Sequence, residues 1–273
     1  MKKKDTLSST EIINKIILKN DQFYIVKNIN NNNHLVKIDN LETVLDDLPD
    51  ELYCKAYKPE VLKILIKNET GRESKFGGSK PFFVMGEKWP SYNKYYMTFF
   101  CQFKDPREQD NILYRVFILL DDDGICDKYW ISKIELSEEN IKNQIILEKP
   151  KVKKYFADSN TNNKFKPYKI VSWINKKELV SFEKIRKYFG INDYQYNEDN
   201  RIYNELNSIF YNHKYGPSSG IKVGGTPLST QDHEFVQNYD LIQLEYTTFL
   251  PYGWGDSGIA HVSKDLKFTW DCC

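Results

Sequence analysis

A short motif of lysine, one apolar residue and two glycines occurs twice, and it constrains the fold more than any other feature of the sequence. The two copies are Lys75–Gly78 and Lys222–Gly225, and each is soon followed by a proline, Pro81 or Pro227. Glycine tolerates positive φ, while proline fixes its own φ and favours an extended residue before it. Each copy therefore predicts a sharp turn that leads into a β-strand.

Both copies are followed by an apolar strand that contains one glutamine, Gln102 in FFCQF and Gln243 in LIQLEY. A buried amide without hydrogen-bond partners would cost roughly 1–3 kcal/mol. We expect each amide to bond to backbone in or beside its Gly-Gly turn; the alternative is a pair of glutamines that face a ligand. The repeated motif and the glutamine-containing strand after each copy predict a weak internal duplication. The two halves lie at about 57–150 and 167–273, and Lys80 is an extra residue in the first copy of the motif.

The pattern of apolar residues predicts strands in both halves and two helices in the second half. Alternating apolar residues bounded by acidic or glycine turns indicate hairpins, one of them across Asp123-Gly124. Helical spacing predicts amphipathic helices at 178–190 and 198–212, and the polar stretch 150–166 is typical of a linker. We expect an α+β fold, a mainly antiparallel β-sheet built from two weakly repeated halves with a few peripheral helices.

The first 52 residues carry a different pattern. Ser8 and Glu11 form a capping box, and the isoleucines that follow are spaced as in a helix, which predicts a short amphipathic helix within 8–20. Two β-rich pieces around an asparagine tract then predict a hairpin. We therefore expect residues 1–52 to form a helix-and-hairpin extension whose deletion leaves residues 53–273 folded.

The charge and hydropathy patterns exclude several classes of partner. The 273 residues include 39 Lys and Arg against 38 Asp and Glu, a formal charge of +1, so a nucleic-acid partner is not expected. No apolar run reaches the roughly 18–20 residues of a membrane helix, and the first residues lack a signal-peptide pattern. We expect a cytoplasmic protein without a membrane partner. Its five scattered cysteines are interpreted as reduced thiols, and none has zinc-site spacing.

The motifs in this order also resemble the YwqG-like family, a domain of unknown function. The resemblance runs from about Tyr57 to Phe268 and rests on SKFGG…P…WP, FFCQF, KVGGTP, LIQLEY and WGDSG…VSKDLKF. The resemblance implies a compact, mainly antiparallel α+β fold in an intracellular protein. It also gives a lead on function, because YwqG-like proteins have been linked to gene neighbourhoods of bacterial toxins and their immunity proteins. It implies no reaction and no catalytic residues. Lys80 and Phe82-Phe83 depart from the family pattern.

Several residues are candidates for a ligand or interface role. A Gly-Gly turn with its lysine could form an anion-binding nest, but a plain turn is the simpler interpretation because no phosphate-loop pattern follows. An aspartate in a loop such as GWGDSG most often caps a turn. The adjacent Asp232, His233 and Glu234 point apart, so no metal site is expected. The candidate residues are Lys75, Gly77, Gly78, Trp89, Gln102, Lys222, Gly224, Gly225, Gln243, Trp254 and Asp256.

No catalytic motif stands out in the sequence. It has no cysteine close to a histidine, no catalytic residue is assigned, and no cofactor is expected. We predict a non-catalytic module that binds another protein, with an immunity-like or regulatory role. The alternative is a small-ligand-binding protein or enzyme that works in a cleft between the two halves. The partner and the oligomeric state are left open.

Overall fold

The computed structural model describes residues 15–29, 32–93, 95–120, 126–147, 166–191, 198–231, 236, 238–245, 247, 250, 254 and 257–272. The chain is divided between two units, each of which takes up two separate stretches of sequence. Unit 1 contains residues 1–54 and 178–217, and unit 2 contains residues 55–177 and 218–273. The predicted extension, residues 1–52, is therefore one part of a unit that also includes helices from the second half.

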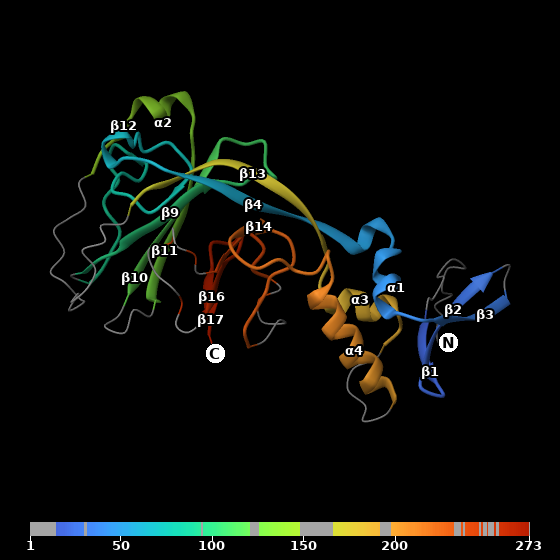
Figure 1. The fold of residues 1–273 in the computed structure, drawn as a ribbon. Coiled ribbons are helices and arrows are strands. Elements are labelled where there is room, and N and C mark those ends of the chain that lie inside the picture. The colour runs from blue at the N-terminus through green and yellow to red at the C-terminus, as the bar shows by residue number, and fades with distance from the viewer. Residues whose placement is uncertain are drawn as a thin grey trace, which may run out of the picture. The chain divides into compact units, whose positions relative to one another are not determined.

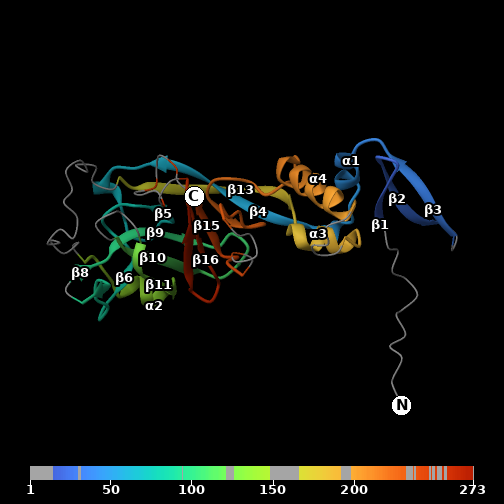
Figure 2. The same ribbon diagram turned by 90° about the horizontal axis from the view of Figure 1, so that it is seen from below.

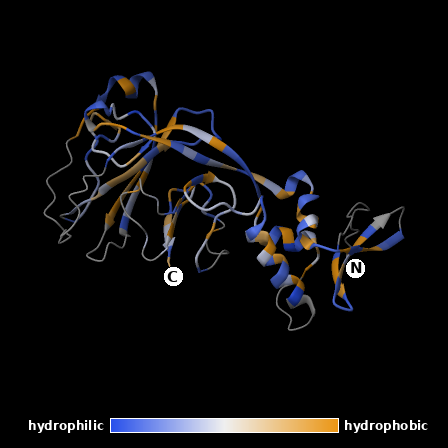
Figure 3. Ribbon diagram, viewed as in Figure 1, coloured by the Kyte–Doolittle hydropathy of each residue, from blue (hydrophilic) through white to orange (hydrophobic). Residues whose placement is uncertain are grey.

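Unit 1 combines a three-stranded antiparallel sheet, in the order β1-β2-β3, with α-helices (Figure 1). Its elements are β1 (Lys15–Lys19), β2 (Gln22–Ile29), β3 (Asn32–Ile38), α1 (Leu41–Asp46), α3 (Phe182–Tyr188) and α4 (Glu198–Asn212), with a 3-10 turn at Asp50–Leu52. Both stretches of sequence contribute to one apolar core, in which Leu45, Leu206 and Phe210 are fully buried. Figure 3 shows that α3 and α4 each carry hydrophobic and hydrophilic segments, as expected for helices that cover a core.

The structure corrects the first predicted helix and confirms the elements that follow it. Residues 15–19 form strand β1, in which Ile16 pairs with Ile25 and Ile17 with Tyr24, and residues 8–14 lie outside the described residues. Isoleucine is β-branched and suits a strand, so pairing with β2 overrides the helical spacing. The predicted hairpin is confirmed as β2 and β3, and the predicted helix at 198–212 is confirmed as α4. The helix predicted at 178–190 is confirmed only as the shorter α3, because Glu178 and Leu179 end strand β13 (Tyr168–Leu179) instead.

Unit 2 is built on a ten-stranded sheet in the order β11-β10-β9-β5-β13-β4-β14-β15-β16-β17 within the described residues. Its strands are β4 (Tyr53–Lys63), β5 (Lys75–Phe76), β9 (Thr98–Lys104), β10 (Ile112–Leu120), β11 (Cys126–Glu135), β13 (Tyr168–Leu179), β14 (Lys222–Gly224), β15 (Ile242–Glu245), β16 (Ile259–Val262) and β17 (Phe268–Asp271). The sheet is nearly closed, because Tyr129 on edge strand β11 and Phe268 on edge strand β17 have ring centroids 5.4 Å apart. The predicted hairpin of β10 and β11 is confirmed, whereas its Asp123-Gly124 turn lies outside the described residues.

Shorter elements cover the outer face of the β9–β11 strands. They are a 3-10 turn at Ile66–Asn68, β6 (Phe83–Val84), which pairs with β12 (Gln144–Ile145), β7 (Ser91–Tyr92), which pairs with β8 (Tyr95–Tyr96), and α2 (Glu138–Lys142). Figure 2 shows α2 and β6 on the same side of these strands. Phe82 and Leu113, both fully buried, pack there with Leu136 at the start of the α2 segment.

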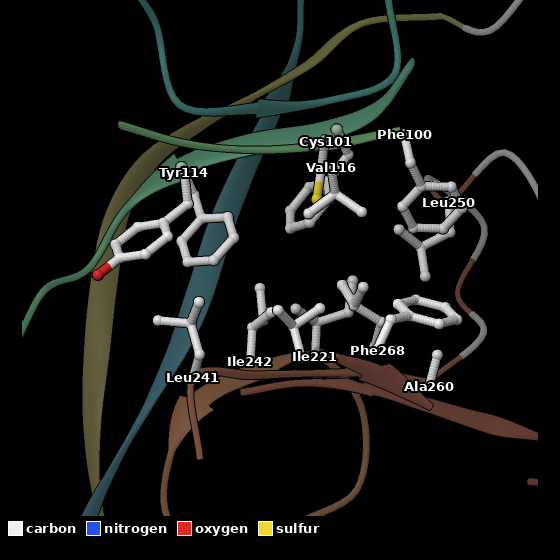
Figure 4. Close-up of a cluster of buried hydrophobic side chains, with 14 of the residues drawn as sticks. Phe100, Cys101, Tyr114, Val116, Ile221, Leu241, Ile242, Leu250, Ala260 and Phe268 are labelled. Atoms are coloured by element: carbon white, nitrogen blue, oxygen red, sulfur yellow. The ribbon is translucent and has the colours of Figure 1, made fainter. Parts of the chain in front are cut away.

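The inner face of the sheet holds the main core of unit 2. In Figure 4, Phe100, Cys101 and Val116 from strands β9 and β10 point toward Ile242 and Phe268 from strands β15 and β17. Burying large apolar side chains in this way is the dominant favourable term in folding. The space between the two sides of the sheet is therefore filled by apolar side chains of the described residues.

The predicted fold class, a mainly antiparallel α+β fold with a few helices, is confirmed. The internal duplication stays a prediction. Across the described ranges, no helix has both the length and the apolar character needed to cross a membrane.

Candidate functional site

The first Gly-Gly turn is an anion-binding nest that is filled by the chain's own carboxylate. Both of its glycines have positive φ, +64° and +92°. The Glu69 carboxylate accepts hydrogen bonds from the backbone N–H groups of Ser79 and Lys80, each at 3.2 Å, and from Lys75 Nζ at 2.7 Å. The Lys75 and Glu69 side chains are fully buried. The turn and its lysine therefore hold an internal anion rather than a ligand.

The two glutamines bond to the backbone on both sides of their turns, as predicted. Gln102 Nε2 donates to the carbonyls of Gly71 and Glu73, both at 2.8 Å, and Gln102 Oε1 accepts from the N–H of Phe82 at 2.9 Å. These carbonyls lie four and two residues before Lys75, and the N–H lies seven residues after it. The amide thus ties together the two chain segments that enter and leave the turn.

The second turn repeats this arrangement. Gly224 and Gly225 have φ of +65° and +74°, so the prediction of positive φ is confirmed at both turns. Gln243 Nε2 donates to the carbonyls of Ser218 and Gly220 at 3.4 and 3.0 Å, and Gln243 Oε1 accepts from the N–H of Leu228 at 2.8 Å. Both glutamine amides therefore bond to the chain's own backbone.

Strand pairing places each lysine and glutamine in a row of four polar residues on the outer face of the sheet. The first row is Lys75, Gln102, Arg115 and Ser132, on strands β5, β9, β10 and β11. The second row is Lys222, Gln243, His261 and Thr269, on strands β14, β15, β16 and β17. In each row the register puts every residue directly opposite its neighbour.

The third residue of the first row is Arg115, and all three of its guanidinium nitrogens have partners in the chain. Its buried guanidinium donates to both carboxylate oxygens of Glu87 at 2.8 and 2.9 Å, to the Phe82 carbonyl at 2.7 Å and to Ser132 Oγ at 3.0 Å. Burial raises the pKa of the Glu87 carboxyl. Hydrogen bonds from Arg115 and from the Val84 N–H together lower it by more than burial raises it, so the net pKa lies below its usual value. This row contains a cation held by a carboxylate.

The third residue of the second row, His261, is fully buried, and neither ring nitrogen has a hydrogen-bond partner. Burial lowers the pKa of His261 to about 4. The Asp271 carboxylate and the Leu228 carbonyl raise this pKa only in part, and the nearby charge of Lys222 lowers it further. The Leu228 carbonyl thus lies near enough to raise this pKa, but it is not a hydrogen-bond partner of either ring nitrogen. Asp271 Oδ1 and Thr230 Oγ1 are two more buried polar atoms without a partner.

Sequence reasoning did not single out His261, Asp271 or Thr230. The alternation in IAHV predicts that His261 and Ile259 share a face, but only the strand register shows that Gln243 and Thr269 flank the histidine. Asp271 joins this face because it lies two residues beyond Thr269 on the same strand. A sequence-level signal would have required the pairing of all four strands.

The other candidate residues lie in the core or outside the described residues. Trp89 is buried, donates from Nε1 to the Met97 carbonyl at 2.7 Å and packs edge-on against Phe117. Trp254 is buried against Phe100 and Phe268, and its Nε1 has no partner. Asp256, the trio 232–234 and most of the linker 150–166 lie outside the described residues.

The described residues contain no group of three or more His, Cys, Asp or Glu side chains that could hold a metal ion. Among the described cysteines, Cys54, Cys101 and Cys272 are reduced thiols. Cys101 is fully buried, and burial raises the pKa of its thiol, which makes it a poor nucleophile.

Unit 1 contains a pocket of about 380 Å³ that sequence reasoning missed. One wall is the β2–β3 hairpin, with Ile25 and Val36 directly opposite each other. Val44, Leu48 and Phe189 contribute further apolar surface from α1 and the end of α3. The lining also contains Lys27, Lys37, Asp39 and Asp47, and none of its residues is serine, cysteine or histidine.

Comparison with protein-family models and with curated protein sequences finds no match to this chain, so the YwqG-like resemblance stays a prediction.

Proposed function

We propose that the protein is a non-catalytic module that binds another protein through the pocket of unit 1. The observation that carries this proposal is the exposure of strand β3, whose Val36 lines the pocket. Six of its seven residues are exposed, and they include Leu35 at 52% and Val36 at 38%. The volume of the adjoining pocket is in the range that accommodates small ligands or a few side chains.

The position of β3 favours an extended peptide as the bound segment. Within the described part of the chain it is an edge strand of its sheet, so its outward backbone groups can pair with one more strand. A peptide paired there could place apolar side chains against Val36 and Leu48. The pocket also carries lysines and aspartates, and charges of both signs suit a polar rim around an apolar contact.

Two observations count against the alternative of a ligand cleft between the two halves. The space between the two sides of the sheet is filled with apolar side chains (Figure 4). Gln102 and Gln243, which could have lined such a cleft, use their amides on the chain's own backbone. An immunity-like or regulatory role in the cytoplasm, without nucleic acid, is part of the proposal.

Site-specific photo-crosslinking tests the proposal. A photoreactive amino acid replaces Val36 in the full chain, in the cells that normally produce it, and the same amino acid replaces the exposed Glu139 of α2 as a control. We expect position 36 to capture one defined protein that position 139 does not capture. Val36→Asp should then weaken binding of that purified partner by about tenfold or more without lowering the melting temperature.

The proposal is wrong if positions 36 and 139 capture the same proteins, or if Val36→Asp binds the captured partner as tightly as the wild type does.

A further inference from the structure

Three side chains that meet on the outer face of strands β16 and β17 each carry at least one buried polar atom without a hydrogen-bond partner. His261 pairs with Thr269, and Asp271 lies two residues further along the same strand, so the His261 and Asp271 side chains are diagonal neighbours on one face. Their Cβ atoms are then about 7 Å apart. This separation leaves room for one bound atom between a ring nitrogen and a carboxylate oxygen.

The segment that covers this face holds the carboxylate in place. Asp271 Oδ2 accepts hydrogen bonds from the Thr230 N–H at 3.2 Å and from Ser229 Oγ. Asp271 Oδ1 is buried without a partner, and so is the hydroxyl of Thr230. An imidazole, a carboxylate oxygen and a hydroxyl oxygen are thus all buried in one neighbourhood with unused lone pairs. Such groups in a folded protein call for a bound water or ion.

The matched place in the first row shows what kind of group fits between such acceptors. There the guanidinium of Arg115 lies between the Phe82 carbonyl and the Glu87 carboxylate. In the second row the Leu228 carbonyl and the Asp271 carboxylate lie near the corresponding residue, His261. Its imidazole is shorter than the arginine side chain of the first row. The second row therefore has the acceptors of a cation without a cationic side chain between them.

We propose that His261, Asp271 and Thr230 form a site for one divalent transition-metal cation such as Zn²⁺. Imidazole nitrogen and carboxylate oxygen are ligands that Zn²⁺ prefers, and hydroxyl oxygen can complete the protein's donors. The bound cation takes the role that the guanidinium has in the first row. It links the covering segment around Thr230 to the edge of the sheet.

Zinc binding to the full-length protein tests this site. The purified chain is stripped with a chelator and dialysed against ZnCl₂, and bound metal and melting temperature are measured. We expect one Zn²⁺ per chain and a higher melting temperature with zinc. His261→Gln and Asp271→Asn should each weaken binding at least about tenfold. The matched control is His213→Gln, because His213 is also buried beside an aspartate, with Nε2 3.2 Å from Asp46 Oδ1 in unit 1, and it should bind zinc like the wild type.

His261→Arg keeps the test decisive if the glutamine variant folds poorly. It copies the first row, so it should fold and bind no zinc. The proposal is overturned if the wild type binds no zinc in stoichiometric amount, or if His261→Arg binds as much as the wild type.

Discussion

Glu69 shows how one side chain decides whether a glycine turn is a binding site. A nest of backbone N–H groups attracts any anion, and here the nearest anion is a carboxylate six residues before Lys75. Gly78 lies directly beside this carboxylate, and a Cβ added there would clash with Glu69 Oε2. Gly86 has the same φ of +92°, but a Cβ added there would meet no atom within 4 Å.

Comparing alanine substitutions at Gly78 and Gly86 distinguishes the cost of backbone strain from the cost of a side-chain clash. Gly78→Ala and Gly86→Ala both place alanine at positive φ, which costs about 1–2 kcal/mol. Only Gly78→Ala also displaces the buried Glu69 carboxylate from Lys75, so we expect it to lose at least about 2 kcal/mol more. Urea unfolding of both variants measures the difference. Equal losses would show that the carboxylate moves aside at little cost.

Sequence reasoning identified the role of the two glutamines but not that of His261. Gln102 and Gln243 could be predicted as structural because a mid-strand amide next to a turn has carbonyls and N–H groups within reach. His261 could not be predicted, because its significance depends on Asp271 and Thr230, which approach it only when β16 and β17 pair. Local sequence specifies a group's chemistry, whereas its neighbours come from pairing over long separations.

At the scale of elements, strands were predicted well and the first helix was wrong. Strands β9, β10 and β11 carry β-branched and aromatic residues between strong turn signals. The segment at β1 carries two adjacent isoleucines after a capping box, a pattern that suits either type of element. Its partner strand β2 decides the outcome, and a pattern within one element does not contain that information.

Strand β10 is held to the loop after β6 by the ion pair of Arg115 and Glu87. The folded state keeps the pKa of Glu87 below its usual value, so the unfolded chain takes up a proton at higher pH than the folded chain does. The stabilisation is present above about pH 4.5 and is lost as the pH falls through the lowered pKa. The free energy of unfolding, followed from pH 7 to pH 3, should therefore fall less steeply for Glu87→Gln than for the wild type. The variant should also be less stable at pH 7, because Arg115 keeps its buried charge without a carboxylate partner.

The exposed Glu139→Gln is the control, and it should follow the wild-type curve. An unchanged acid slope for Glu87→Gln would mean that this pair does not contribute to acid unfolding.

At the scale of the whole molecule, the chain leaves unit 2 and returns to it. The apolar faces of α3 and α4 were predictable, but the surface on which they pack was not, because helical spacing identifies a face and not its partner. That partner includes Leu41 and Leu45 of α1, so residues before 53 and residues after 178 share one core.

This shared core changes the expected result of deleting residues 1–52. The truncated chain would expose Leu206 and Phe210, both fully buried in the full chain. We expect it to bind a hydrophobic dye and to lose protection from hydrogen exchange in α3 and α4. Leu45→Asp in the full chain should do the same in milder form. Dye-free, cooperative melting of residues 53–273 at the wild-type temperature would contradict this expectation.

The position of β4 in the middle of the large sheet has a consequence for synthesis on the ribosome. Ala56 of β4 pairs with Gly224 of β14, about 170 residues later in the chain. At a translation rate of roughly 5–20 residues per second, β4 emerges about 10–30 s before that partner exists. Its other neighbour, β13, also arrives late. An early strand with two open edges is a target for aggregation and for chaperones, so the nascent chain should depend on protection until its last quarter has been made.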